Sequence, residues 1–209
     1  MDGATWAVLS KTKNCSFLKI RMYNWTVPYL IYDDFLEAED FEFVQDYAER
    51  VTNNLSLNNK LIEEKIHDSW QSHNWIKIAN THKPICNEPA VINLYDKYSP
   101  QLMSMLCTLS LEKLKLADYH TISLIVTEPN AEYPVHLDSP NKLLSCVLYV
   151  SEDNIGTMLY STKDKQDPYE VEWKPNRLFV FSRSDDSWHS WNSNDDYRAT
   201  LVWNIMLDG

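Results

Sequence analysis

The sequence of 209 residues contains few glycines and few cysteines. Only three glycines occur, and Gly156 is the one that lies within the body of the chain. A glycine-rich loop that cradles phosphate groups is therefore excluded, and with it the nucleotide-binding folds that depend on such a loop. The four cysteines are widely spaced and form no C-x-x-C pair, which argues against a structural zinc site or a disulfide framework and favours a reducing compartment.

Long apolar runs and positive charge are also scarce. No run approaches the length of a membrane span, and the N-terminus lacks the charged-then-apolar pattern of a secretion signal. We therefore expect a cytoplasmic protein without a membrane partner. The formal net charge of −11 gives poor long-range attraction for phosphate backbones, so nucleic acid is a disfavoured partner. The sequence indicates no particular oligomeric state.

The composition is that of a folded globule, with 44% hydrophobic and 12% aromatic residues. At this length we expect one domain over residues 1–209, with a helical and irregular support region (1–118) and a strand-rich core (119–206). Eight short runs in the core have strand character and are separated by clusters of turn residues, which predicts a double-sheet jelly roll. These runs are residues 119–127, 133–138, 143–151, 157–161, 169–173, 177–182, 187–191 and 198–206.

The support region has weaker patterns. Apolar spacing predicts a helix over 36–53 and one or two helices over 91–116, interrupted at Ser99-Pro100. We expect these helices to pack outside the strands and buttress one sheet. The remaining expectations are an edge strand within 16–22, a strand over 29–32, a turn-rich joint over 53–59, a short helix over 61–66 and mostly loop over 67–90.

The stretch Tyr133–Pro140 contains a His-x-Asp pair, His136 and Asp138, at the end of one predicted strand. Residues i and i+2 of a strand project from the same face, so these two side chains can converge on one point. An imidazole and a carboxylate supply two of the three ligands of a 2-His-1-carboxylate site for non-haem Fe(II). The pair alone is also compatible with a surface pair near a turn.

A third candidate ligand and an anion-binding residue follow in the sequence. His189 lies after the apolar run 177–181, and Arg198 lies nine residues further on, at the start of the last predicted strand. A strand, a hairpin turn and a returning strand would bring both into one cavity. Arginine suits a carboxylate because its planar fork donates two parallel hydrogen bonds. Thr200, at i+2 from Arg198, would face the same side and add a hydroxyl donor.

Together these residues resemble the Fe(II)/2-oxoglutarate-dependent oxygenases, in particular their prolyl-hydroxylase-like branch. The resemblance covers residues 119–206, with a weaker match over 29–51, and includes the His-x-Asp-x-Pro-Asn motif. It implies a double-stranded β-helix in which His136, Asp138 and His189 hold iron and Arg198 pairs with the far carboxylate of 2-oxoglutarate. It further implies that Tyr149 hydrogen-bonds that carboxylate, with Ser145 on the same strand face. The chain departs from the branch before the His-x-Asp motif, where Thr127-Glu128 stands instead of a second tyrosine.

The resemblance implies an enzyme that needs Fe(II), 2-oxoglutarate as cosubstrate and O2, with ascorbate in support, and that hydroxylates an unactivated C–H bond. By analogy with this branch, the expected substrate is a prolyl residue in a peptide or protein, and the alternative is a free amino acid or another small metabolite. Trp188 and Trp191 flank the third ligand, and Tyr133 precedes the first, so these three are candidate substrate contacts. Two rival hypotheses are a cupin-like jelly roll that binds metal or ligand without turnover, and a structural jelly roll.

Overall fold

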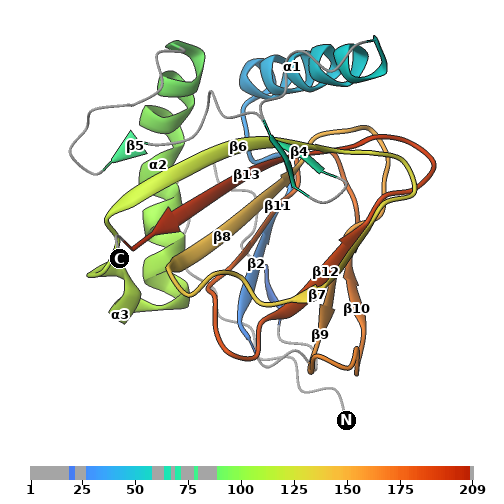
Figure 1. Cartoon of the computed structure of the whole chain (residues 1–209). Coiled ribbons are helices and arrows are strands. Elements are labelled where there is room, and N and C mark those ends of the chain that lie inside the picture. The colour runs from blue at the N-terminus through green and yellow to red at the C-terminus, as the bar shows by residue number, and fades with distance from the viewer. Residues whose placement is uncertain are drawn as a thin grey trace.

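The structure is a computed structural model of the whole chain, and it describes residues 27–57 and 89–207. Four short strands outside these ranges are described by their backbone alone: β1 (Lys19–Arg21), β3 (Glu64–Ile66), β4 (Ser69–Gln71) and β5 (Ile78–Ala79). Two antiparallel sheets lie face to face over part of their length, and the helices cover the outer face of the larger sheet (Figure 1). The predicted architecture, a double-stranded β-helix with helices buttressing one sheet, is confirmed.

The nine-stranded major sheet has the order β1-β2-β11-β8-β13-β6-β4-β3, and β5 also pairs with β6. Its longer strands are β2 (Tyr29–Tyr32), β6 (Tyr119–Thr127), β8 (Lys142–Tyr149), β11 (Leu178–Phe181) and β13 (Arg198–Met206). The four-stranded minor sheet has the order β10-β9-β12-β7. Its strands are β7 (Glu132–His136), β9 (Thr157–Tyr160), β10 (Tyr169–Val171) and β12 (Trp188–Asn192). All eight strands predicted from residue 119 onward are present.

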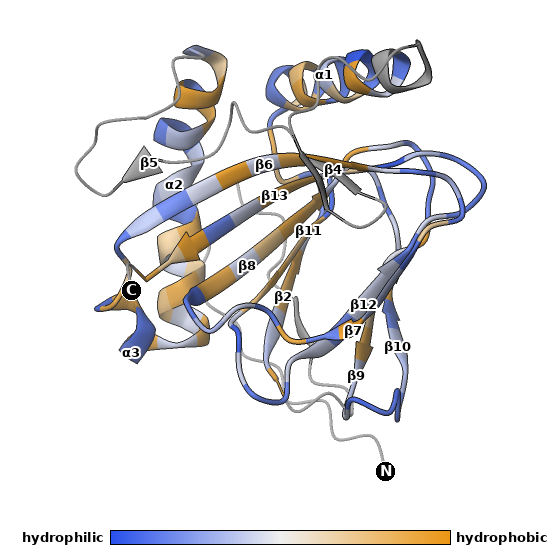
Figure 2. Cartoon of the chain, in the orientation of Figure 1, coloured by the Kyte–Doolittle hydropathy of each residue, from blue (hydrophilic) through white to orange (hydrophobic). Residues whose placement is uncertain are grey.

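One hydrophobic core lies between the major sheet and the helices α1 (Ala38–Leu57) and α2 (Pro89–Leu109). Alternate residues of the sheet strands, such as Leu201 and Trp203 of β13, point into this core and meet Leu102 and Leu106 of α2. Figure 2 shows the apolar strands of the major sheet, with hydrophilic residues concentrated in the connecting loops. Every second residue of these strands and the apolar face of α2 are therefore buried against each other.

His120 of β6 also belongs to this core, with 1% of its surface exposed. Its Nδ1 accepts a hydrogen bond from Trp203 Nε1 at 3.0 Å, and its ring packs edge-on against Tyr95 of α2. Burial lowers the pKa of His120 to about 4, so the ring is a neutral acceptor at neutral pH. The remaining histidines outside the site, His67, His73 and His82, lie outside the described residues.

A second, smaller core lies between the two sheets and fixes their separation. Tyr29, Tyr149, Phe179 and Phe181 from the major sheet meet Leu159 and Val171 from the minor sheet. Residues Leu178–Phe181 of β11 are buried on both faces, since Leu178 and Val180 face the helices while Phe179 and Phe181 face the minor sheet. A strand covered on both faces reads as an unbroken apolar run, as this one does in the sequence.

The support region differs from the sequence expectations in four places. The predicted break at Ser99-Pro100 is wrong, because α2 runs through Pro100. A proline removes one backbone hydrogen bond, while the buried side chains Tyr98 and Leu102 on either side hold the helix against the sheet. The expected turn-rich joint is displaced, since α1 continues to Leu57. Residues 64–66 of the expected short helix instead form β3, and parts of the loop expected over 67–90 form β4 and β5.

These first-half strands join the edges of the major sheet, so the strand-rich region does not begin at residue 119. β2 pairs with β11, and two contacts strengthen the connection. Arg177 donates from Nε to Asp33 Oδ1 at 2.6 Å, and the amide of Asn176 bonds both the N–H and the carbonyl of Leu36. A final short helix, α3 (Leu111–Leu114), leads from α2 into β6. Within the described residues, no helix combines the length and the apolar character that a membrane crossing requires.

Candidate metal centre

Two histidines and one aspartate from three segments meet at the open side of the two-sheet sandwich. His136 is the last residue of β7, and His189 is its partner on the neighbouring strand β12. Asp138 lies two residues beyond the end of β7, so the expectation that it shares a strand face with His136 is wrong. The potential ligand atoms of the three side chains nevertheless lie within 4.8 Å of one another. This separation allows all three to contact one ion.

The backbone fixes the orientation of both imidazole rings. Nδ1 of His136 lies 2.9 Å from the carbonyl oxygen of Pro134, and Nδ1 of His189 lies 2.9 Å from that of Ser187. A carbonyl can only accept, so each Nδ1 carries the proton and each Nε2 keeps a free lone pair. Metal-binding histidines in proteins use the same arrangement, in which the second nitrogen donates to a backbone or carboxylate oxygen.

Because Asp138 lies outside β7, hydrogen bonds from neighbouring side chains fix the position of its carboxylate. Its Oδ1 lies 2.7 Å from Lys142 Nζ, and its Oδ2 accepts a hydrogen bond from Ser145 Oγ at 2.5 Å. Burial by itself would raise the pKa of this carboxyl group, but the attraction of Lys142 and His189 and the two hydrogen bonds hold the pKa well below its usual value. Asp138 is therefore an anionic ligand at any physiological pH.

The two histidines are neutral in this setting. Burial lowers the pKa of His189 to about 4, and the nearby His136 and Lys142 act in the same direction while Asp138 opposes them. Burial is also the main cause of the lowered pKa of His136. Neutral imidazole is the form that binds metal, so no proton has to be displaced at neutral pH.

Arg198, the first residue of β13, lies on the other side of the same cavity. Only 2% of its surface is exposed, its Nε donates to the carbonyl of Ile155 at 3.4 Å, and its buried Nη2 has no hydrogen-bond partner among the described residues. The rings of Tyr149, Trp173 and Trp191 surround the guanidinium at 5.0–6.0 Å. Burial lowers its pKa to about 10, so the group remains charged. A buried cation without an anionic partner is costly, which indicates a site for an anion.

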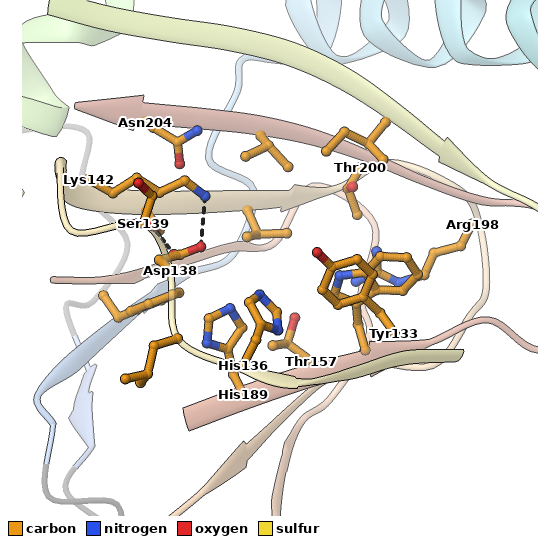
Figure 3. Close-up of a pocket in the computed structure, with 17 residues that line it drawn as sticks. Tyr133, His136, Asp138, Ser139, Lys142, Thr157, His189, Arg198, Thr200 and Asn204 are labelled. Atoms are coloured by element: carbon orange, nitrogen blue, oxygen red, sulfur yellow. Dashed lines mark hydrogen bonds and ion pairs between the residues drawn. The ribbon is translucent and has the colours of Figure 1, made fainter. Parts of the chain in front are cut away.

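The triad and Arg198 line one cavity, which has a volume of about 360 Å³. Figure 3 shows His136, His189 and Asp138 on one side and Arg198 on the other, with Thr200 and Thr157 between them. Apolar residues of the major sheet complete the walls: Ile125, Val147, Phe181 and Val202. The arrangement can hold a metal ion at one end and the carboxylate of a bridging ligand at the other.

Comparison with known proteins gives matches among solved structures alone: no protein-family model matches this chain, and no curated protein matches it. A prolyl-4-hydroxylase from Pseudomonas putida superposes with a TM-score of 0.63 at 20% identity, covering 88% of this chain and 95% of that one. A prolyl hydroxylase from Trichoplax adhaerens, solved with a peptide of the hypoxia inducible factor, gives 0.61 at 13% identity, covering 85% and 83%. The chain has the prolyl 4-hydroxylase fold.

Other solved 2-oxoglutarate-Fe(II) oxygenases share the architecture. One from Burkholderia pseudomallei superposes with a TM-score of 0.57 at 12% identity, covering 85% of this chain and 84% of that one. The prolyl-4-hydroxylase-like fold therefore extends over most of the chain, including part of the support region. The ligand triad and Arg198 lie within the part of this fold that the structure describes.

Two residues expected at the cosubstrate have other contacts. The hydroxyl of Tyr149 lies 3.2 Å from the carbonyl of Val171, accepts the backbone N–H of Thr157 at 2.9 Å, and lies 3.0 Å from Thr157 Oγ1. Tyr149 therefore joins the two sheets of the prolyl-4-hydroxylase-like fold, and Thr157 lines the cavity in its place. Ser145 bonds Asp138, which makes it a positioning residue for the metal ligand. Thr200 lines the cavity as expected from its spacing.

The candidate substrate contacts divide into two groups. Tyr133 and Trp191 line the cavity, and their rings stack with centroids 4.7 Å apart. Trp188 is not among the lining residues, because it precedes His189 on β12 and so points to the opposite face of the strand. On β6, Ile125 lines the cavity opposite Thr200, so an apolar side chain stands near the position where Thr127-Glu128 departs from the oxygenase pattern.

Sequence reasoning missed four polar cavity residues, Ser139, Lys142, Thr157 and Asn204. Asn204 could have been found, because it continues the alternation of Arg198 and Thr200 along β13. Lys142 and Thr157 carry no such signal, since their positions depend on how the β7–β8 loop and β9 pack against the major sheet.

Proposed function

We propose that this chain is an Fe(II)- and 2-oxoglutarate-dependent dioxygenase that hydroxylates an unactivated C–H bond. The observation that carries this proposal is the pairing of a two-histidine, one-carboxylate triad with a buried guanidinium whose Nη2 has no hydrogen-bond partner among the described residues, all in one cavity. A metal-binding jelly roll without turnover would need the triad but would have no use for the buried charge of Arg198. A purely structural jelly roll would need neither.

The residues present fit a ferrous ion. Two neutral imidazoles with free Nε2 atoms and one anionic carboxylate would supply three ligands to the ion, the donor set that non-haem Fe(II) oxygenases use. His136, Asp138 and His189 would hold the ion. Ser145 and the two backbone carbonyls would orient the ligands, and such outer contacts contribute to metal affinity.

The opposite end of the cavity fits the far carboxylate of 2-oxoglutarate. Arg198 has an Nη2 donor without a partner among the described residues, and Thr200 and Thr157 place hydroxyl groups between it and the triad. The stacked rings around the guanidinium restrict it to one orientation, so little conformational entropy is lost when a carboxylate binds. Together these side chains would hold the cosubstrate between Arg198 and the metal.

When bound, iron and 2-oxoglutarate supply the oxidising chemistry, in which O2 is consumed and 2-oxoglutarate is converted to succinate and CO2. The protein positions the reactants and excludes water from them. Val147, Val202 and Phe181 give the cavity walls an apolar surface near the triad. The candidate substrates are a prolyl residue in a peptide or protein, and a free amino acid or another small metabolite, with Tyr133 and Trp191 beside them.

The direct test is succinate formation from 2-oxoglutarate with Fe(II) and ascorbate. We expect iron-dependent succinate from the native protein and none from the Asp138→Ala variant. Asp164→Ala, which changes an exposed carboxylate in the loop before β10, serves as the control and should match the native protein. Metal binding without any succinate from the native protein would favour the non-catalytic jelly roll.

A further inference from the structure

A polar group of side chains lies beyond the triad, on the side away from Arg198. Figure 3 shows Lys142, Ser139 and Asn204 there, and all three line the cavity. Lys142 begins β8, and Asn204 lies on β13 directly opposite Ser145. A cosubstrate that joins the metal to Arg198 would leave this end of the cavity free, so it is the natural place for the substrate.

Asn204 has a buried acceptor without a donor. Only 8% of the residue is exposed, and its Nδ2 donates to Thr121 Oγ1 at 3.2 Å. Its Oδ1 is fully enclosed and has no hydrogen-bond partner among the described residues. Leaving a buried carbonyl oxygen unpaired costs free energy that a donor from a ligand would recover. The position therefore favours a ligand with an N–H or O–H group.

Lys142 provides unused donors next to this acceptor. An ammonium group has three N–H donors, and within the described part of the chain its side chain bonds Asp138 Oδ1 alone, at 2.7 Å. Its side chain is 24% exposed, so the remaining donors are accessible from the cavity. Two donors on a fixed positive charge are suited to a carboxylate.

The charges of the lining residues support the same assignment. Lys142 and Arg198 are each positive and Asp138 is negative, so with neutral histidines the lining has a net charge of +1. A divalent metal ion and dianionic 2-oxoglutarate cancel each other, and the single positive charge remains. A substrate carboxylate would interact favourably with the charge of Lys142, whereas a prolyl residue inside a peptide chain has no carboxylate to offer.

We propose that the substrate is a small acid with an N–H group beside its carboxylate, bound with the carboxylate at Lys142 and the N–H at Asn204 Oδ1. This rests on the proposed function and specifies its substrate class. The cavity volume of about 360 Å³ is near the lower end of the range for ligand sites. With the cosubstrate in place, the remaining space suits a group the size of one amino acid. That group is a free amino or imino acid or the C-terminal residue of a peptide.

The test is a binding measurement on protein loaded with Zn(II) and N-oxalylglycine, a stable analogue of the cosubstrate. The twenty standard amino acids and their carboxamides are titrated by calorimetry, together with N-acetylated dipeptides ending in a free acid or an amide. We expect at least one acid to bind at least tenfold more tightly than its amide. Preference for free amino acids over dipeptide acids identifies the first source, and the reverse preference identifies the second.

Variants connect the preference to the residues. For the acid that binds, Lys142→Met should weaken binding at least tenfold, Lys142→Arg should retain most of it, and Lys163→Met, an exposed lysine, should leave it unchanged. Asn204→Ala is a second variant, which changes none of the three metal ligands. It should also weaken binding of the acid. Equal binding of acids and amides across the set, or no binding of any acid to the loaded protein, would overturn this assignment alone. Failure of the native protein to bind Zn(II) and N-oxalylglycine would overturn the proposed function with it.

Discussion

Replacing Arg198 with methionine should separate the stability of the protein from its affinity for the cosubstrate. Methionine keeps most of the contacts with the surrounding rings but removes a buried charge that has no anionic partner in the described part of the chain. The desolvation cost of a buried guanidinium is several kcal/mol. Each ring offsets about 0.5–2 kcal/mol of that cost through cation–π attraction. We therefore expect the metal-free, ligand-free variant to be as stable as the native protein, or more stable by about 1–2 kcal/mol.

Cosubstrate affinity should move in the opposite direction. A hydrogen bond to a charged group contributes about 1.5–3 kcal/mol, and the guanidinium can donate two to one carboxylate. Because roughly 1.4 kcal/mol corresponds to a factor of ten, Arg198→Met should weaken 2-oxoglutarate binding on the order of 100- to 10,000-fold. Urea denaturation measures the first effect, and the charge-transfer absorbance of the Fe(II)–2-oxoglutarate complex measures the second.

Arg50→Met, in an exposed position on α1, is the matched control and should change neither quantity appreciably. The reasoning is refuted if Arg198→Met lowers the free energy of unfolding by more than about 2 kcal/mol while cosubstrate affinity stays within about threefold of native. That combination would mean that the guanidinium has a structural role in place of anion binding.

Three further predictions concern single contacts. Ser145→Ala removes the hydrogen bond to Asp138 Oδ2 and should weaken metal affinity about 10- to 100-fold in a chelator competition assay; unchanged affinity would exclude the positioning role. The pKa of His120 is about 4 in the folded state and near 6.5 in the unfolded state. Burial of the neutral ring therefore contributes its full share to the free energy of unfolding above pH 6.5, and this contribution is lost as the pH falls toward 4. Urea titrations across this window should show that the free energy of unfolding falls by about 3 kcal/mol in the native protein and by less in the His120→Gln variant. An equal fall in both proteins would mean that other groups cause it. Gly156→Ala would place a Cβ atom 1.9 Å from the carbonyl oxygen of Val171. Thermal denaturation should therefore show a destabilisation of at least about 3 kcal/mol. A near-native melting temperature would contradict the tight packing of β9 on β10.

The strand core was predictable because its signals are local. The strands β6, β8, β11 and β13 are mostly apolar and mostly buried, and turn residues separate the strands between Tyr119 and Met206. The ligand triad was predictable from residue chemistry, since His136, Asp138 and His189 are chemically unusual at the ends of strands. The departure of Asp138 from strand geometry was not visible, because Lys142 and Ser145 hold it through contacts formed only after β8 packs beside the loop.

The unpredicted features depend on partners distant in sequence. β3 and β4 form because β4 pairs with β6, roughly fifty residues later, and apolar spacing over 61–66 contains no trace of that pairing. Pro100 is accepted because the buried face of α2 packs on the major sheet, which overrides the local preference of proline. The hydroxyl of Tyr149 turns to Val171 across the sandwich, a contact that no spacing within β8 could indicate.

A crystal grown with Mn(II) and N-oxalylglycine tests the central claim most directly. We expect one ion bound by His136, Asp138 and His189, chelated by the analogue, with the far carboxylate of the analogue bonded to Arg198 and Thr200. An ion held by other residues, or an analogue whose carboxylate does not contact Arg198, would contradict the account.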